Sequence, residues 1–129
     1  MTETYPCAED LIGAVSDFLK SDVAPMLVDS ALQFKLKIAV NVLAIVRREL
    51  ERGQHQLEKE KDALAAMLRE DGDVLHLRQR LIEAINAGEF DAKEDELLSV
   101  LEAQSLRQIA IDNPRYSTYQ ALAKSTSLL

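Results

Sequence analysis

The stretch that decides the fold runs from Ser30 to Gly53 and reads SALQFKLKIAVNVLAIVRRELERG. At about 100° per residue its large apolar side chains fall into two adjacent bands, which cover more than half of a helix circumference. Ser30 and Gln33 form a capping-box pattern, and Gly53 is a typical stop, so the sequence predicts a helix over about 31–52. Because it is so apolar, we expect it to lie centrally, with neighbours on at least two sides. The first band comprises Leu32, Leu36, Ala39, Leu43, Val46 and Leu50, and the second comprises Phe34, Ile38, Val42 and Ile45.

The segments on either side also have helical rather than strand periodicity. Helices are predicted around Leu11–Leu19, over Gln54–Asp71, from Val74 to a stop at Gly88, and over Ala92–Asp112. The expected fold is therefore all-α, a compact bundle of about five helices around the central apolar helix. We expect one domain over residues 1–116, followed by an irregular, partly flexible C-terminal tail over 117–129.

Several residues are expected to set the helix boundaries. Pro25 should end the first helix and push Ala24 into an extended conformation, because proline disfavours helical geometry in the preceding residue. Asp73 should cap the helix that begins at Val74. Asp91 with Glu94 resembles a second capping box and is expected to start the last helix.

The C-terminal segment begins where Asn113 and Pro114 break the last helix. Beyond this break the apolar residues form no full helical stripe, so no packed helix is expected there. Tyr116 is the residue that we expect to fold back and cover the end of the bundle. From Ser125 onward the chain is expected to be mobile.

Composition excludes several classes of function. The chain has 129 residues, 47% of them hydrophobic and 29% charged, and its formal net charge is -7. This acidity disfavours nucleic acid as a partner, because phosphates require clustered Lys and Arg. The longest apolar stretch, Ile38–Val46, is far shorter than the roughly 20 residues of a membrane helix. A single thiol, Cys7, suits a reducing compartment, so the sequence predicts a cytoplasmic protein without a membrane partner.

No residue stands in a catalytic or metal-binding motif. Cys7 has no base near it in the sequence, and His55 and His76 are too far apart to be a metal signature. The mixed-sign run Glu58–Asp62 is typical of a solvated helix face. The sequence therefore favours a non-catalytic protein with no metal and no cofactor.

One polar strip is a candidate ligand site. Lys37, Asn41 and Arg48 follow one side of the central helix, next to the apolar bands. Asn41 lies at the edge of the apolar arc, where its amide is expected to be half-buried and to need hydrogen-bond partners. The two cations and the amide could together hold a phosphate or a carboxylate.

Two segments resemble a bacterial family of small helical proteins of unknown function. The first is FKLKIAVNVLAIVRRELE, from Phe34 to Glu51, which is similar to the central helix of the family. The second is Asn113-Pro114-Arg115-Tyr116, which resembles its closing motif. The turns at Asp71–Asp73 and Asn86–Glu89 also match, so the resemblance extends from about Ala8 to Tyr116.

The resemblance assigns no activity and no catalytic residue. It departs from the family pattern at Gln33 and Lys35, where a small or His-containing run is more usual. Genes of the family often lie beside those for an acyl-CoA dehydrogenase and an aminoglycoside-phosphotransferase-like kinase. This neighbourhood implies an accessory role in acyl-CoA or hydroxyacyl metabolism, with either enzyme as a partner.

Two hypotheses of function follow from the sequence. The first is a helical accessory or interaction protein, and the second is a small-ligand binding protein or minor enzyme that uses Lys37, Asn41 and Arg48. The apolar central helix also raises the question of self-association. A two-fold homodimer would bury its excess surface, while a five-helix monomer that wraps it completely remains the alternative.

Overall fold

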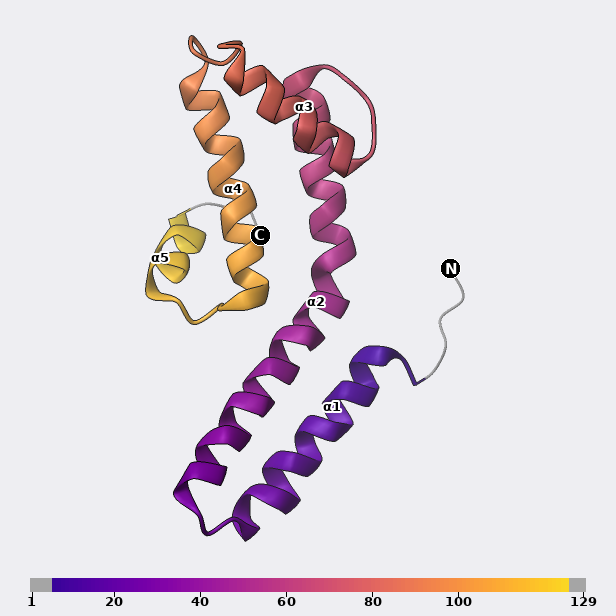
Figure 1. Ribbon diagram of the computed structural model, residues 1–129, viewed down its shortest axis with the longest axis vertical. Coiled ribbons are helices and arrows are strands. Elements are labelled where there is room, and N and C mark those ends of the chain that lie inside the picture. Colours follow the sequence, from indigo (N-terminus) through magenta and orange to yellow (C-terminus); the bar gives the residue numbers. More distant parts are fainter. Residues whose placement is uncertain (1–5, 126–129) are drawn as a thin grey trace. The chain divides into compact units, whose positions relative to one another are not determined.

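The computed structural model describes residues 6–125 and shows helices joined by turns, with no strand among these residues (Figure 1). The prediction of an all-α fold with about five helices is confirmed. Two short helical turns, η1 (Leu19–Val23, a π-helix) and η2 (Ala24–Met26, a 3-10 helix), follow the first helix. The five α-helices are α1 (Ala8–Phe18), α2 (Ser30–Leu68), α3 (Val74–Asn86), α4 (Glu94–Asp112) and α5 (Ser117–Ser125).

Contacts within the chain group it into two compact units. The first ends at Gly53, and the second begins at Gln54. The single domain expected over residues 1–116 stays a prediction.

Helix α2 is much longer than the sequence predicted. It runs for 39 residues, so the predicted stop at Gly53 and the separate helix over Gln54–Asp71 are wrong. A glycine inside a helix costs only about 1 kcal/mol relative to alanine, and the Glu, Arg and Gln residues around it are good helix formers. The helix ends instead before Arg69, which has a φ of 55°, and not at Gly72.

The start of α2 is capped by a residue other than the one predicted. Asp29 accepts a hydrogen bond from the backbone N–H of Ala31 at 3.2 Å, while Ser30 is already the first helical residue. Gln33 donates through Nε2 to the carbonyl oxygen of Leu27 at 2.8 Å. The capping position therefore lies one residue earlier than the capping-box pattern indicated.

The break between α1 and α2 also differs from the prediction. Ala24 is helical, with φ -54° and ψ -44°, so the extended conformation predicted for it is wrong. Pro25 lies in the first turn of η2, where its missing N–H leaves no helical bond unmade. The chain leaves the helical region only at Leu27, with φ -84° and ψ 126°.

In the first unit, α1 lies alongside the N-terminal part of α2 as a helical hairpin (Figure 1). Gly13 is buried at this contact, and a Cβ atom there would lie 2.9 Å from Nη1 of Arg47. The missing side chain thus gives the Arg47 guanidinium room against α1.

The second unit has a core of buried apolar residues. Leu64 of α2 packs with Leu77 and Leu81 of α3 and with Phe90 of the following turn. Asp73 caps α3 as predicted, accepting a hydrogen bond from the backbone N–H of His76 at 2.8 Å.

At the turn between α3 and α4, the predicted end of α3 is confirmed and the predicted start of α4 is wrong. Gly88, with a φ of 78°, follows the end of α3, as the sequence predicted. Helix α4 begins at Glu94 rather than Ala92, and Asp91 does not cap it. The reason is that the backbone N–H groups of Asp91 and Lys93 are already bonded in consecutive turns, to Gly88 and Phe90.

The C-terminal segment forms a packed helix, so the predicted irregular tail is wrong. Tyr119 of α5 is only 8% exposed and packs with Leu106 and Ala110 of α4, whereas Tyr116 is 47% exposed. Tyr119 and its neighbours Leu122 and Ala123 follow i, i+3, i+4 spacing, a stripe that suffices for one short helix. Residues 126–129, part of the predicted mobile end, lie outside the described residues.

Candidate functional site

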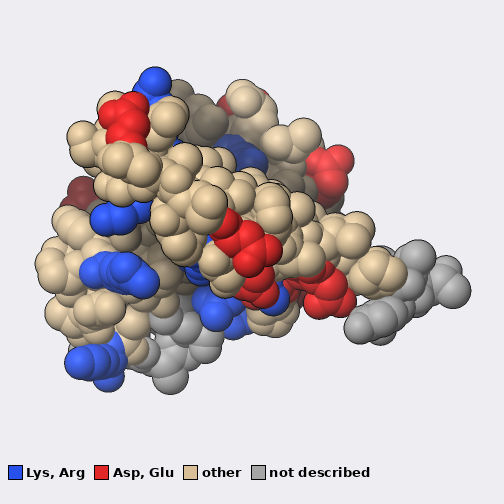
Figure 2. Space-filling model, turned by 90° about the horizontal axis from the view of Figure 1, so that it is seen from below, with Lys and Arg blue, Asp and Glu red and all other residues tan. Residues whose placement is uncertain are grey.

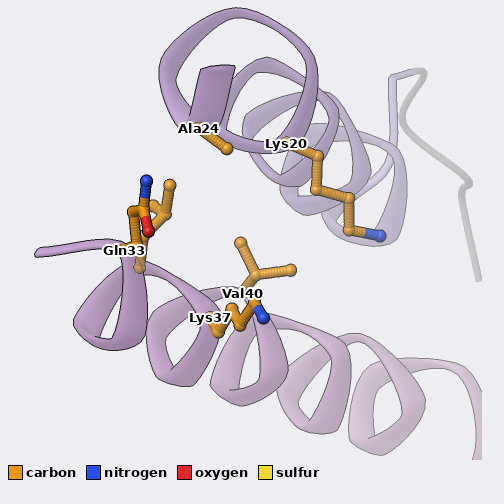
Figure 3. A pocket seen from close by; sticks show the side chains of 6 residues that line it. Lys20, Ala24, Gln33, Lys37 and Val40 are labelled. Atoms are coloured by element: carbon orange, nitrogen blue, oxygen red, sulfur yellow. The ribbon is translucent and has the colours of Figure 1, made fainter. Parts of the chain in front are cut away.

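The predicted polar strip lies on α2 in the first unit, and the structure gives its members different surroundings. Lys37 lines a cavity of about 420 Å³ together with Lys20 and Ala24 from the preceding helical turns (Figure 3). Gln33, Leu36 and Val40 of α2 complete the lining. In Figure 3 the Val40 side chain points toward the segment that carries Lys20 and Ala24. The cavity is therefore an amphipathic cleft with two lysine residues in its lining.

Asn41 and Arg48 do not line this cleft. Asn41 is exposed, so the half-burial predicted for it is wrong, while Arg48 is half-buried. The reason is geometric. At a rise of about 1.5 Å per residue, Lys37 and Arg48 lie roughly 16 Å apart along the helix axis, too far to share one small ligand. Lys20 was not predicted as a site residue. It comes from another segment of the chain, and no local sequence pattern indicates that it lines the cleft.

Apolar side chains are exposed along both helices of the hairpin. Leu11, Val15 and Phe18 share one face of α1 and are each more than half exposed. On α2, Phe34 is 64% exposed and Ile38 is 49% exposed. Among the described residues of the first unit, no large apolar side chain is buried. Figure 2, a view from below, marks Lys and Arg in blue and Asp and Glu in red among residues of all other types.

The single thiol has acidic neighbours that disfavour its thiolate form. Hydrogen bonding to Glu9, and then to Asp10, raises the pKa of the Cys7 thiol above its usual value. Its Sγ lies 3.1 Å from Oδ2 of Asp10. Because the thiolate is the nucleophilic form, these neighbours disfavour nucleophilic chemistry at Cys7.

A second polar group lies in the second unit, and the sequence analysis missed it. Glu60 is 7% exposed, so the solvated face predicted for Glu58–Asp62 is wrong at this position. Both of its carboxylate oxygens accept hydrogen bonds from Arg78, at 2.7 and 2.6 Å. Arg107 of α4, 6% exposed, lines the same cavity as these two side chains.

A sequence signal for this group does exist. Glu60 lies three residues after Leu57 and four before Leu64, in line with the apolar stripe of this part of α2. An acid at a stripe position is buried with the stripe and needs a partner. The charges that flank Glu60 in the sequence hide this register.

These features define an all-α protein with an apolar helical hairpin in one unit and a buried ion cluster in the other. Residues 26–116 match the family described as a domain of unknown function, DUF6285, and the chain belongs to that family. The resemblance to a family of unknown function is thus confirmed. No curated protein and no solved structure matches the chain. Within residues 6–125, no helix is both long enough and apolar enough to cross a membrane.

Proposed function

We propose that the chain is a non-catalytic interaction protein of the cytoplasm whose N-terminal hairpin pairs with a second copy of itself. The observation that carries the proposal is the exposed apolar surface of α1 and α2. Leu11, Val15 and Phe18 on α1 are between 51% and 54% exposed, and Phe34 and Ile38 on α2 are 64% and 49% exposed. Exposed apolar patches of this extent are typical of interaction sites.

The size of this surface fits a dimer. Leu32, Val42, Val46 and Leu50 of α2 add to this set, each at least 40% exposed. Each partner in a standard interface contributes about 800 Å². Two hairpins packed face to face would form a four-helix arrangement, in which each hairpin covers the apolar surface of the other.

The test is the mass of the full chain in solution. Sedimentation equilibrium should give about twice the 14.4 kDa of one chain. Phe34→Glu should give the monomer, because it places a charge in the apolar interface. Leu98→Glu is the matched control: Leu98 of α4 is 60% exposed, close to the 64% of Phe34, and this variant should stay dimeric. A wild-type chain that remains monomeric over the whole concentration range would overturn the proposal.

The family resemblance suggests a more specific role, as an accessory subunit of an acyl-CoA dehydrogenase or of a phosphotransferase-like kinase. The same hairpin supports this extension, since its apolar surface could dock on either enzyme. Tagged wild-type chain, co-expressed with each enzyme from the same genome, should retain the partner through purification. The Phe34→Glu variant should lose the partner, and retention by both proteins would place the contact elsewhere.

The amphipathic cleft supports a second candidate function, the binding of an anionic ligand. Lys20 and Lys37 supply positive charge, while Leu36 and Val40 supply apolar surface. A ligand with an anionic head and an apolar body would match this lining. Lys37→Gln should weaken binding of octanoate measured by calorimetry, whereas Asn41→Ala, outside the cleft, should not.

A further inference from the structure

A second cavity, in the second unit, combines apolar walls with buried charge. Its volume is about 250 Å³, and residues of α2, α3 and α4 line it. Leu64, Leu81 and Val100 provide apolar wall. Three charged side chains, Glu60, Arg78 and Arg107, lie around the same space.

The charges of this cavity do not balance. Glu60 is the one acid among its described lining residues, and the fork of Arg78 occupies both of its oxygens. Arg107 donates from Nη2 to Oε1 of Gln104 at 2.9 Å, but its Nε–H is buried without a partner. The cavity lining therefore carries two guanidinium groups and one carboxylate, which leaves an excess of one positive charge.

Such an excess is costly in an apolar setting. Desolvation lowers the pKa of Arg107, an effect that the charge of Glu60 partly offsets. A buried donor without a partner is also rare in folded proteins, because its lost hydration is not replaced. One bound anion would neutralise the charge, and it would also accept the free hydrogen bond once the Arg107 side chain turns its Nε–H toward the ligand.

We propose that this cavity binds a small monocarboxylate with a short apolar chain. A carboxylate is planar and matches the guanidinium fork, which favours it as the acceptor for Arg107. The apolar walls fit an alkyl chain, and the volume restricts its length to a few carbons. A phosphate dianion matches less well, because it would bring one negative charge more than the cavity can neutralise.

The test is a titration of the full-length chain with butyrate, followed by calorimetry and by NMR of the arginine side chains. Butyrate should shift the Nε–H signal of Arg107 along a saturable curve. Butyramide, which has nearly the same shape without the charge, should leave the signal in place. Inorganic phosphate should bind more weakly than butyrate. No saturable shift with butyrate, or tighter binding of phosphate, would overturn the assignment.

Variants separate a ligand site from a structural arginine. Arg107→Met should weaken butyrate binding by at least about tenfold, the effect of losing one charged hydrogen bond. It should still fold, since a methionine of similar length replaces an unbalanced charge. Arg80→Met is the matched control, because Arg80 is bonded to Glu70 and Glu83 outside the cavity. The Kd of this variant for butyrate should stay within about twofold of the wild-type value.

A second substitution keeps the proposal testable if Arg107→Met does not fold. Arg107→Lys retains the positive charge but lacks the fork and the Nε–H, so it too should bind butyrate more weakly than the wild type. Wild-type affinity in Arg107→Lys, or in a folded Arg107→Met protein, would show that Arg107 does not hold the carboxylate.

Discussion

The ion pair between Glu60 and Arg78 offers the sharpest test of the packing in the second unit. Glu60→Gln keeps the shape of the side chain but removes its charge. The Glu60 side chain is 9% exposed and accepts two short hydrogen bonds from Arg78. The substitution leaves Arg107 without the acid that opposes its desolvation. We therefore expect Glu60→Gln to destabilise the protein.

The size of the effect follows from the exposure of the two partners. Breaking a fully buried pair costs about 3–5 kcal/mol, whereas an exposed pair contributes about 0–1 kcal/mol. The Arg78 side chain is 43% exposed, so water can take over part of its hydration after the change. An intermediate loss of about 2 kcal/mol in the free energy of unfolding is expected. In a double-mutant cycle, Glu60→Gln and Arg78→Gln should couple by about 1 kcal/mol.

Urea unfolding at pH 7, monitored by far-UV circular dichroism, measures these values. Glu58→Gln, an exposed position on the same helix, is the control and should change the free energy of unfolding by less than about 0.5 kcal/mol. A Glu60→Gln protein as stable as this control, together with a coupling near zero, would refute the reasoning that burial strengthens the pair.

Helix packing and the surroundings of Cys7 can be tested by single substitutions. Tyr119→Ala should lower the free energy of unfolding by about 3 kcal/mol and Tyr116→Ala by under about 1 kcal/mol, because only Tyr119 is buried. Urea unfolding measures both values, and the opposite order would contradict the packing of α5. Gly53→Ala should raise the helix content and stabilise the protein by about 0.5–1 kcal/mol, because Gly53 is helical and alanine favours a helix. The atom nearest to the new Cβ is the end of the flexible Glu49 side chain, which can move away. A loss of stability would contradict a continuous α2. At pH 8, Glu9→Gln should speed the alkylation of Cys7 by iodoacetamide. The hydrogen bonding with Glu9 raises the pKa of the thiol, so its loss lowers that pKa and increases the thiolate fraction. An unchanged or slower rate would exclude Glu9 as the cause.

The fold class could be predicted from the sequence, because helical periodicity repeats in every long segment. Helix boundaries were harder, since they depend on a few competing residues. Gly53 looks like a stop, yet the residues around it favour the helix strongly enough to continue through it. Tyr119 was overlooked because its stripe is only one turn long, and its value comes from the contact with Leu106 on another helix.

The candidate sites show the same limit, because a site needs residues from several segments. Lys37 was predicted from α2 alone, but its companion Lys20 could not be, since nothing in the sequence fixes the turn that brings the two together.

The buried charged residues of the second unit could have been predicted from the sequence more readily than the lining of the cleft. Glu60 and Arg107 each occupy a position that helical spacing assigns to an apolar stripe, since Glu60 lies four residues before Leu64 and Arg107 four residues before Ile111. A charge at such a position needs a polar partner, and the structure supplies Arg78 for Glu60 and Gln104 for one nitrogen of Arg107. One acid then faces two bases, Arg78 and Arg107, and the pairing cannot be complete within this cluster. The unpartnered Nε–H of Arg107 is therefore the group in this unit at which a bound anion would supply a missing hydrogen bond and a missing negative charge.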